Sequence, residues 1–155
     1  MALLGMSHWF FGNLYEAVVF SPNWIVDSSA QMTRLEGFFV NTGPTMYFVP
    51  LAMLAPILVW VLLAVNKVGA ARADYRRAGL FALLATVLNG VIVTMVVTNL
   101  FDPHNLGDTM KLTRLAWQWN ILNLCRMLLT AATGVFLFNA LSKLEAVVVP
   151  PRPNT

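Results

Sequence analysis

The sequence predicts an all-α protein, a bundle of four transmembrane helices with a short interfacial helix in its first outer loop. Hydrophobic residues make up 58% of the 155 residues, whereas charged residues make up only 11%. Soluble domains carry about 25% charged residues, so this surface is typical of a protein that faces lipid. Four apolar segments also approach the length of about 20 residues that crosses a bilayer as a helix.

These segments predict helices within a single membrane domain of residues 1–149, over residues 2–20, 45–65, 78–101 and 109–144. The first segment has no basic n-region and no small-residue cleavage site after it, so we expect a retained helix rather than a signal peptide. Asp108 is expected to cap the start of the last helix. The tail, residues 150–155, is expected to be disordered.

The loops differ in kind. The outer loop, residues 21–44, is amphipathic. In it, Ser28 and Gln31 match a capping box. Apolar side chains then follow at helical spacing, which predicts a short helix on the outer membrane interface: Met32, Leu35, Phe38 and Phe39. Residues 67–77 are expected to form a short basic turn.

The distribution of lysine and arginine predicts the orientation. Six basic residues lie on the side of the termini and the second loop: Lys67, Arg72, Arg76, Arg77, Lys143 and Arg152. Three lie on the other side: Arg34, Lys111 and Arg114. The positive-inside rule therefore predicts a multi-pass protein, expected in the plasma membrane, with both termini in the cytoplasm. These residues form no basic patch with interleaved aromatic side chains, so we expect no nucleic-acid partner.

Two opposite charges lie inside the apolar segments, Glu16 in the first and Arg126 in the last. An unpaired charge in the hydrocarbon costs at least a few kcal/mol. We therefore expect the two side chains to face each other, directly or through Asn123 or water. Such a pair fixes helix register in one interpretation. In another it belongs to a pocket that uses the same charges on a ligand, and the two interpretations are compatible.

Helical spacing extends this prediction to a candidate site. We expect catalytic roles for Glu16, Arg126, Asn123 and His8. At the same outer level we expect side chains that bind a substrate: Tyr15, Trp119, Asn120, Tyr47 and Asn99. His8 lies about 12 Å deeper at 1.5 Å per residue, where it either hydrogen-bonds across helices or transfers protons. The two histidines lack metal-ligand spacing, and no cofactor motif is present, so we expect neither metal nor cofactor.

Three stretches carry a family resemblance: Gly12-Asn13-Leu14-Tyr15-Glu16, Val97-Thr98-Asn99-Leu100, and the run from Trp117 to Arg126. Together with the order and size of the helices, they resemble the anthrone oxygenase-like family of small four-helix membrane proteins. The resemblance implies action on hydrophobic aromatic polyketides, which some relatives perform by oxygenating an anthrone to an anthraquinone. The site residues that the resemblance implies are first Trp119, Asn123 and Arg126, and then Tyr15 and Glu16.

Two functions from different classes follow as hypotheses. In the first, the protein is a membrane enzyme for a lipophilic, polyketide- or aromatic-like molecule bound between the first and fourth helices under the outer loop. Glu16 or His8 would abstract a proton, and Arg126, Asn123 and Asn120 would stabilise the oxyanion, leading to oxygenation, isomerisation or cyclisation. In the second, a non-enzymatic membrane subunit or lipid-binding protein uses its polar residues only to hold the bundle together.

The expected partners are a hydrophobic small molecule and membrane lipids. A transporter is less well supported, because four helices leave one protomer little room for a pathway and no inverted repeat is visible. The glycine and alanine spacing suits packing within one chain and packing in a homo-oligomer equally well.

Overall fold

The chain is all-α in the computed structural model, which describes residues 1–67 and 69–148, without the side chains of residues 44, 45, 47, 147 and 148. The described residues form helices and no strand: α1 (Ala2–Tyr15), η1 (Glu16–Phe20), α2 (Ser21–Ile25), α3 (Ser28–Phe38), α4 (Pro44–Val65), α5 (Gly69–Val91), η2 (Ile92–Val97), α6 (Thr98–Leu100), η3 (Pro103–Asn105) and α7 (Thr109–Val148). The expected disordered tail, residues 150–155, lies outside the described residues.

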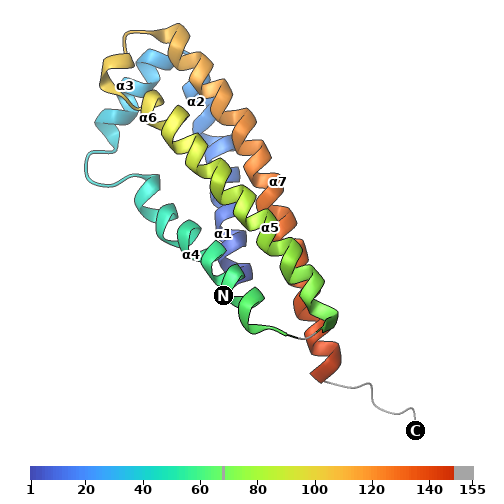
Figure 1. Cartoon of the computed structure of the whole chain (residues 1–155). Coiled ribbons are helices and arrows are strands. Elements are labelled where there is room, and N and C mark those ends of the chain that lie inside the picture. The colour runs from blue at the N-terminus through green and yellow to red at the C-terminus, as the bar shows by residue number, and fades with distance from the viewer. Residues whose placement is uncertain (68, 149–155) are drawn as a thin grey trace.

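Four helical segments pack in a closed ring (Figure 1). α1 packs on α4 and α7, and α5 packs on the same two helices. The pairing of α5 with α7 is the most extensive. Met1 and the C-terminal end of α7 lie toward the same end of the bundle, whereas α3 and α6 lie at the opposite end.

Among the described residues, three helical stretches are long and apolar enough to cross a membrane: Phe48–Val65, Gly69–Leu100 and Thr109–Ala146. This result supports the predicted membrane class for the second, third and fourth expected spans. The stretch from α1 to α2 is not among the three. It carries His8, Asn13 and Glu16, and each of these polar residues lowers its mean hydropathy.

Two π-helical segments interrupt the regular helices, η1 after α1 and η2 after α5. A π-helix contains more residues per turn, and single π turns occur often at functional sites. Along η2 and α6 the buried side chains recur every four residues, at Ile92, Val96 and Leu100. In the first segment η1 continues directly into α2, so the helical stretch ends at Ile25 rather than at the predicted residue 20.

The predicted turn over residues 67–77 is wrong, because α5 begins at Gly69. Alanines, which favour helix, occupy several positions of this stretch. Its acidic residue, Asp74, is buried and accepts a hydrogen bond of 2.5 Å from the ammonium group of Lys143 on α7. This long-range contact holds the polar first turns of α5 against α7. The last helix also runs farther than predicted, to Val148 instead of residue 144.

The helix predicted in the outer loop is confirmed as α3, but its predicted capping box is wrong. Its N-cap is Asp27, and no side chain caps the first turn. Asp27 has a left-handed backbone (φ 48°), which aspartate tolerates better than most residues. The Ser28 hydroxyl instead bonds to the Trp24 carbonyl (2.6 Å) and to the hydroxyl of Thr113 on α7 (2.7 Å). α3 is thereby fastened to the end of the bundle.

The predicted cap of α7 is confirmed. The backbone N–H of Lys111 donates to the Asp108 carboxylate at 2.9 Å, three residues after the cap. This is the contact expected of an aspartate at an N-cap, where it satisfies one of the free amide groups.

Two glycines of α1 allow α4 to approach closely. A Cβ atom at Gly5 would lie 2.8 Å from the Cβ of Ala55, and one at Gly12 would collide with the ring of Phe48. Small residues at helix contacts are common in membranes because they let helix backbones come close together. The two positions lie seven residues apart, so both belong to the same contact face of α1.

Candidate functional site

A buried arginine forms the centre of a polar cluster inside the bundle. Arg126, only 5% exposed, lies on α7 and donates to amide oxygens from three helices. Its acceptors are Asn13 on α1, Asn89 on α5 and Asn123 on α7. The bond to the Asn123 side chain measures 2.6 Å from Nη2 and 3.3 Å from Nε. We call these four residues the arginine cluster.

The amide groups of the arginine cluster also bond to the backbone. The Asn123 side chain donates to the carbonyl of Asn13 at 3.2 Å, and the Asn13 side chain donates to the carbonyl of Trp9 at 2.7 Å. Asn13 and Asn123 are buried. Buried polar groups need such partners, because an unsatisfied one costs about 1–3 kcal/mol. The cluster therefore ties α1, α5 and α7 together at one level.

Glu16 lies at the first position of η1 and is half-buried. Its charge interacts electrostatically with that of Arg126. Within the described residues it forms no direct ion pair with the guanidinium, whose contacts there go to neutral amides. Glu16 and Arg126 thus interact electrostatically at longer range, while the hydrogen bonds of the guanidinium go to asparagine side chains.

A groove of about 680 Å³ lies between α1, the start of α4 and the segment before α4. It contains two predicted site residues, His8 and Tyr15, together with Gly12, Thr42 and Gly43. Phenylalanine rings form most of the remaining wall: Phe11, Phe20, Phe39 and Phe48. The His8 ring lies 5.6 Å from that of Phe48, and the Tyr15 ring lies 5.6 Å from that of Phe20. We call this the aromatic groove.

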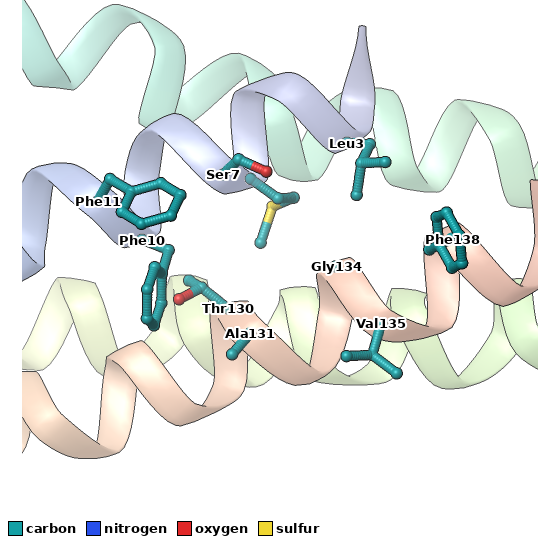
Figure 2. Close-up of a pocket in the computed structure, with 10 residues that line it drawn as sticks. Leu3, Ser7, Phe10, Phe11, Thr130, Ala131, Gly134, Val135 and Phe138 are labelled. Atoms are coloured by element: carbon teal, nitrogen blue, oxygen red, sulfur yellow. The ribbon is translucent and has the colours of Figure 1, made fainter.

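A second groove, of about 310 Å³, lies between α1 and α7, the two helices expected to hold the substrate, but no residue of the outer loop lines it (Figure 2). Its walls are almost wholly apolar, and Figure 2 shows two hydroxyls beside it, from Ser7 and Thr130. Neither this groove nor the aromatic groove is lined by Glu16, Asn123 or Arg126. Of the predicted catalytic residues, Arg126 and Asn123 belong to the arginine cluster, His8 belongs to the aromatic groove, and Glu16 belongs to neither.

Other predicted site residues lie apart from both. Trp119 is buried in a core cluster, where its ring meets that of Trp24 edge-on at 4.9 Å. The Asn120 side chain donates to the carbonyl of Ala116 on its own helix at 2.9 Å. Tyr47 lies on α4, and its side chain is outside the described residues.

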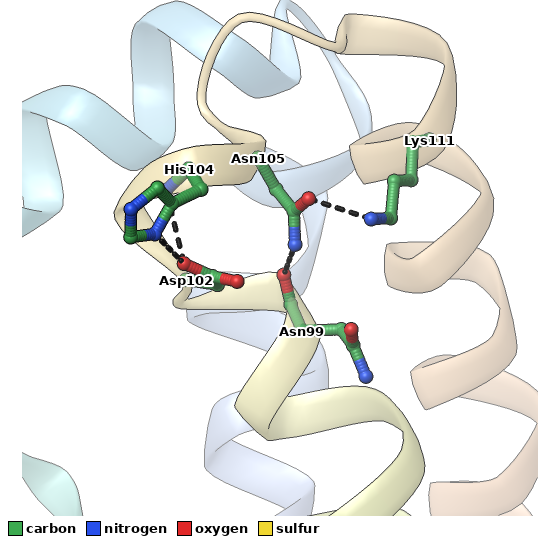
Figure 3. A network of polar contacts seen from close by, with 5 residues as sticks. All are labelled: Asn99, Asp102, His104, Asn105 and Lys111. Atoms are coloured by element: carbon green, nitrogen blue, oxygen red, sulfur yellow. Dashed lines mark hydrogen bonds and ion pairs between the residues drawn. The ribbon is translucent and has the colours of Figure 1, made fainter.

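Asn99 belongs to a polar turn at the end of α6 (Figure 3). Its carbonyl accepts a bond of 2.8 Å from Asn105, whose side-chain oxygen accepts one of 2.6 Å from Lys111. Asp102 accepts bonds from the backbone and the ring of His104, and these contacts lower the pKa of the Asp102 carboxyl below its usual range. The Asn99 side chain donates to the carbonyl of Met95 at 3.1 Å, and Asn99 lines neither groove.

Several residues of these sites are not among the sequence predictions. Asn13 and Asn89 are polar residues in apolar helices, a signal that by default marks a partner or a site. Opposite charge instead favours Glu16 as the partner of Arg126. The rings at positions 20, 39 and 48 carry no such signal, since phenylalanine also suits a lipid-facing position. No group of three or more side chains able to hold a metal ion occurs among the described residues.

Fold and site together define an all-helical chain with three helices able to cross a membrane and a buried arginine bound by three asparagines. None of the protein families, characterised proteins or solved structures with which the chain was compared matches it.

Proposed function

We propose that this protein is an integral membrane enzyme that binds a lipophilic, polyketide- or aromatic-like small molecule in the aromatic groove. The observation that carries the proposal is the convergence of aromatic rings and one imidazole, that of His8, on a single groove of about 680 Å³. Sites for small molecules have volumes of about 300–1,000 Å³ and are lined mainly by apolar and aromatic side chains. Aromatic walls favour a flat ligand, because rings pack edge-on or offset against it.

The proposed chemistry starts with proton abstraction by His8, because imidazole is the side chain that most often acts as a general base. The substrate proton comes from a carbon activated by a neighbouring carbonyl or phenol. Tyr15 donates its hydroxyl proton in a hydrogen bond to the oxygen that gains charge, because it lines the same groove. Oxygenation, isomerisation and cyclisation all begin with this step. The anthrone oxygenase-like resemblance makes anthrone a suitable first substrate to test.

In this proposal α1 with η1 forms a fourth span. Its most exposed side chains are mainly apolar, including Leu4, Phe11 and Val18, whereas Asn13 is turned into the bundle. The lipid-facing side of the segment is thus apolar even though its mean hydropathy is reduced. An even number of spans places both termini on one side, and the basic residues near them favour the cytoplasmic side of the plasma membrane.

Gly12→Ala is expected to weaken binding of anthrone at least tenfold. The added Cβ would collide with the Phe48 ring, so the ring must move, and this ring is part of the groove wall. Gly5→Ala is the matched control, because its Cβ would meet Ala55 on the same α1–α4 contact but outside the groove. Overpacking there costs about 1–3 kcal/mol of stability, while affinity should stay unchanged. Equilibrium binding in detergent, with thermal unfolding of both variants, measures the two effects. Equal affinity losses in both variants would refute the proposed location.

His8→Gln separates an enzyme from a binding protein. Glutamine keeps hydrogen-bonding capacity but cannot accept the substrate proton, and loss of a general base lowers turnover by about 10²–10⁴-fold. We expect unchanged affinity for anthrone and the loss of its conversion, followed by chromatography of the products. A His8→Gln variant that converts anthrone at the wild-type rate would exclude His8 as the base.

A non-enzymatic function is the second candidate, and the arginine cluster favours it. Arg126 is engaged with three amides, and neither groove reaches it. Such residues suit a membrane subunit or lipid-binding protein whose polar side chains hold the helices together. Binding of anthrone without conversion by the wild-type protein would support this function over the enzyme.

A further inference from the structure

The two ends of the bundle carry different charges. The end formed by residues 67–77 and 143–145, here called the basic end, has five basic residues and two acidic ones: Lys67, Arg72, Arg76, Arg77 and Lys143 against Asp74 and Glu145. The opposite end, formed by residues 27–36 and 102–114, has three basic and four acidic residues: Arg34, Lys111 and Arg114 against Asp27, Glu36, Asp102 and Asp108. The basic end keeps its excess of positive charge after its ion pairs are considered.

At the basic end, the buried carboxylate of Asp74 is already neutralised. Lys143 lies 2.5 Å from it, and Arg77 lies 3.6 Å from it while its guanidinium also lies 5.6 Å from the centre of the Phe136 ring. Arg72 and Arg76 are different. Both are exposed, they lie one turn apart on α5, and neither forms an ion pair within the described residues.

The position of these two arginines fits the headgroup level of a bilayer. Two of the helical stretches able to cross a membrane meet here, since Phe48–Val65 ends and Gly69–Leu100 begins at this end. Trp60, 44% exposed on α4, lies about one turn and a half before the helix ends. Exposed tryptophan near the end of a membrane helix is typical of the interface.

We propose that Arg72 and Arg76, with exposed Lys67 at the same end of the bundle, form a docking surface for acidic phospholipids. A guanidinium matches the geometry of a phosphate with two parallel N–H bonds, and a net negative headgroup complements the surplus of positive charge. A zwitterionic headgroup carries no net charge, so its electrostatic attraction to this surface is much weaker. The surface selects phosphatidylglycerol over phosphatidylcholine and holds the basic end against the leaflet richer in acidic lipid.

The test compares two matched double variants of the full chain in detergent. Arg72→Gln with Arg76→Gln removes two exposed charges from the basic end, and Arg34→Gln with Arg114→Gln removes two exposed charges from the opposite end. Native mass spectrometry during a titration measures the affinity for phosphatidylglycerol and for phosphatidylcholine. Each basic residue near an acidic surface contributes about 1 kcal/mol, so the first variant should bind phosphatidylglycerol about 30-fold more weakly at low salt.

The second variant should retain the wild-type preference, and both should unfold at the wild-type temperature because all four side chains are exposed. Salt near 1 M, where charges are screened within about 3 Å, should abolish the preference of the wild type. The proposal is overturned by equal affinities of the wild type for the two lipids. It is also overturned if the first variant keeps the preference, or if both variants lose it to the same extent.

Discussion

Replacing Arg126 by methionine is expected to lower the free energy of unfolding in detergent by about 2–5 kcal/mol. Methionine fills much of the space but donates no hydrogen bond. The side-chain oxygens of Asn13, Asn89 and Asn123 would then lose their charged donor. Two of these acceptors, Asn13 and Asn123, are buried, and leaving a buried polar group unsatisfied costs about 1–3 kcal/mol, so these two groups set the range.

A compensating effect acts in the opposite direction. Burying a guanidinium costs desolvation energy, and an apolar side chain avoids this cost. We expect the unsatisfied amides to outweigh it, because all three remain in the bundle and two of them, Asn13 and Asn123, are buried. The free energy follows from thermal or denaturant unfolding in one detergent. Arg114→Met is the matched control, since it makes the same change at an exposed position of the same helix.

A double-mutant cycle with Asn89→Leu isolates one contact of the cluster. Arg126 and Asn89 come from α7 and α5, so their coupling reports an interhelical bond rather than a bond within one helix. We expect a coupling of about 1 kcal/mol. Coupling near zero, together with an Arg126→Met variant as stable as Arg114→Met, would show that the guanidinium does not hold these helices together.

The sequence predicts the helical class and the apolar spans well, because a stretch of about 20 apolar residues has few alternatives in water or lipid. The start of α5 could not be predicted in the same way. Residues 69–77 carry several charges, and such a stretch is typical of a turn. Here Asp74 pairs with Lys143, 69 positions later in the chain, which neutralises the buried carboxylate. Long-range neutralisation of this kind leaves no local pattern.

Only part of the candidate site could be predicted from the sequence. A buried arginine needs acceptors, and Asn123 was predicted on the same inward face three residues earlier. Opposite charge favours Glu16 as its partner, but the guanidinium bonds instead to the neutral side chains of Asn13 and Asn89 on two other helices. The aromatic groove joins Phe20, Phe39 and Phe48 from three separate segments, and only the fold brings them together.

Lys143→Met is the second substitution expected to have a large effect, with a loss of about 2–4 kcal/mol in the free energy of unfolding. Asp74 has a side chain only 4% exposed, and its carboxylate lies 2.5 Å from the Lys143 ammonium. Without that partner a buried negative charge remains. Breaking a buried ion pair costs about 3–5 kcal/mol. We expect somewhat less, because Lys143 is itself half exposed and Arg77 still lies 3.6 Å from the carboxylate.

Two further variants test whether the loss of stability comes from the unpaired Asp74 carboxylate or from the removal of any lysine charge. Lys67→Met removes the same charge from an exposed position at the same end of the bundle and should change stability little. Adding Asp74→Asn to Lys143→Met removes the buried charge as well and should restore part of the lost stability, since a neutral amide is cheaper to bury than an unpaired carboxylate. If the double variant is less stable than Lys143→Met alone, the unpaired charge is not the source of the damage. The first turns of α5 would then be held against α7 by the apolar contacts around Tyr75 and Ala71, which are buried at the same level.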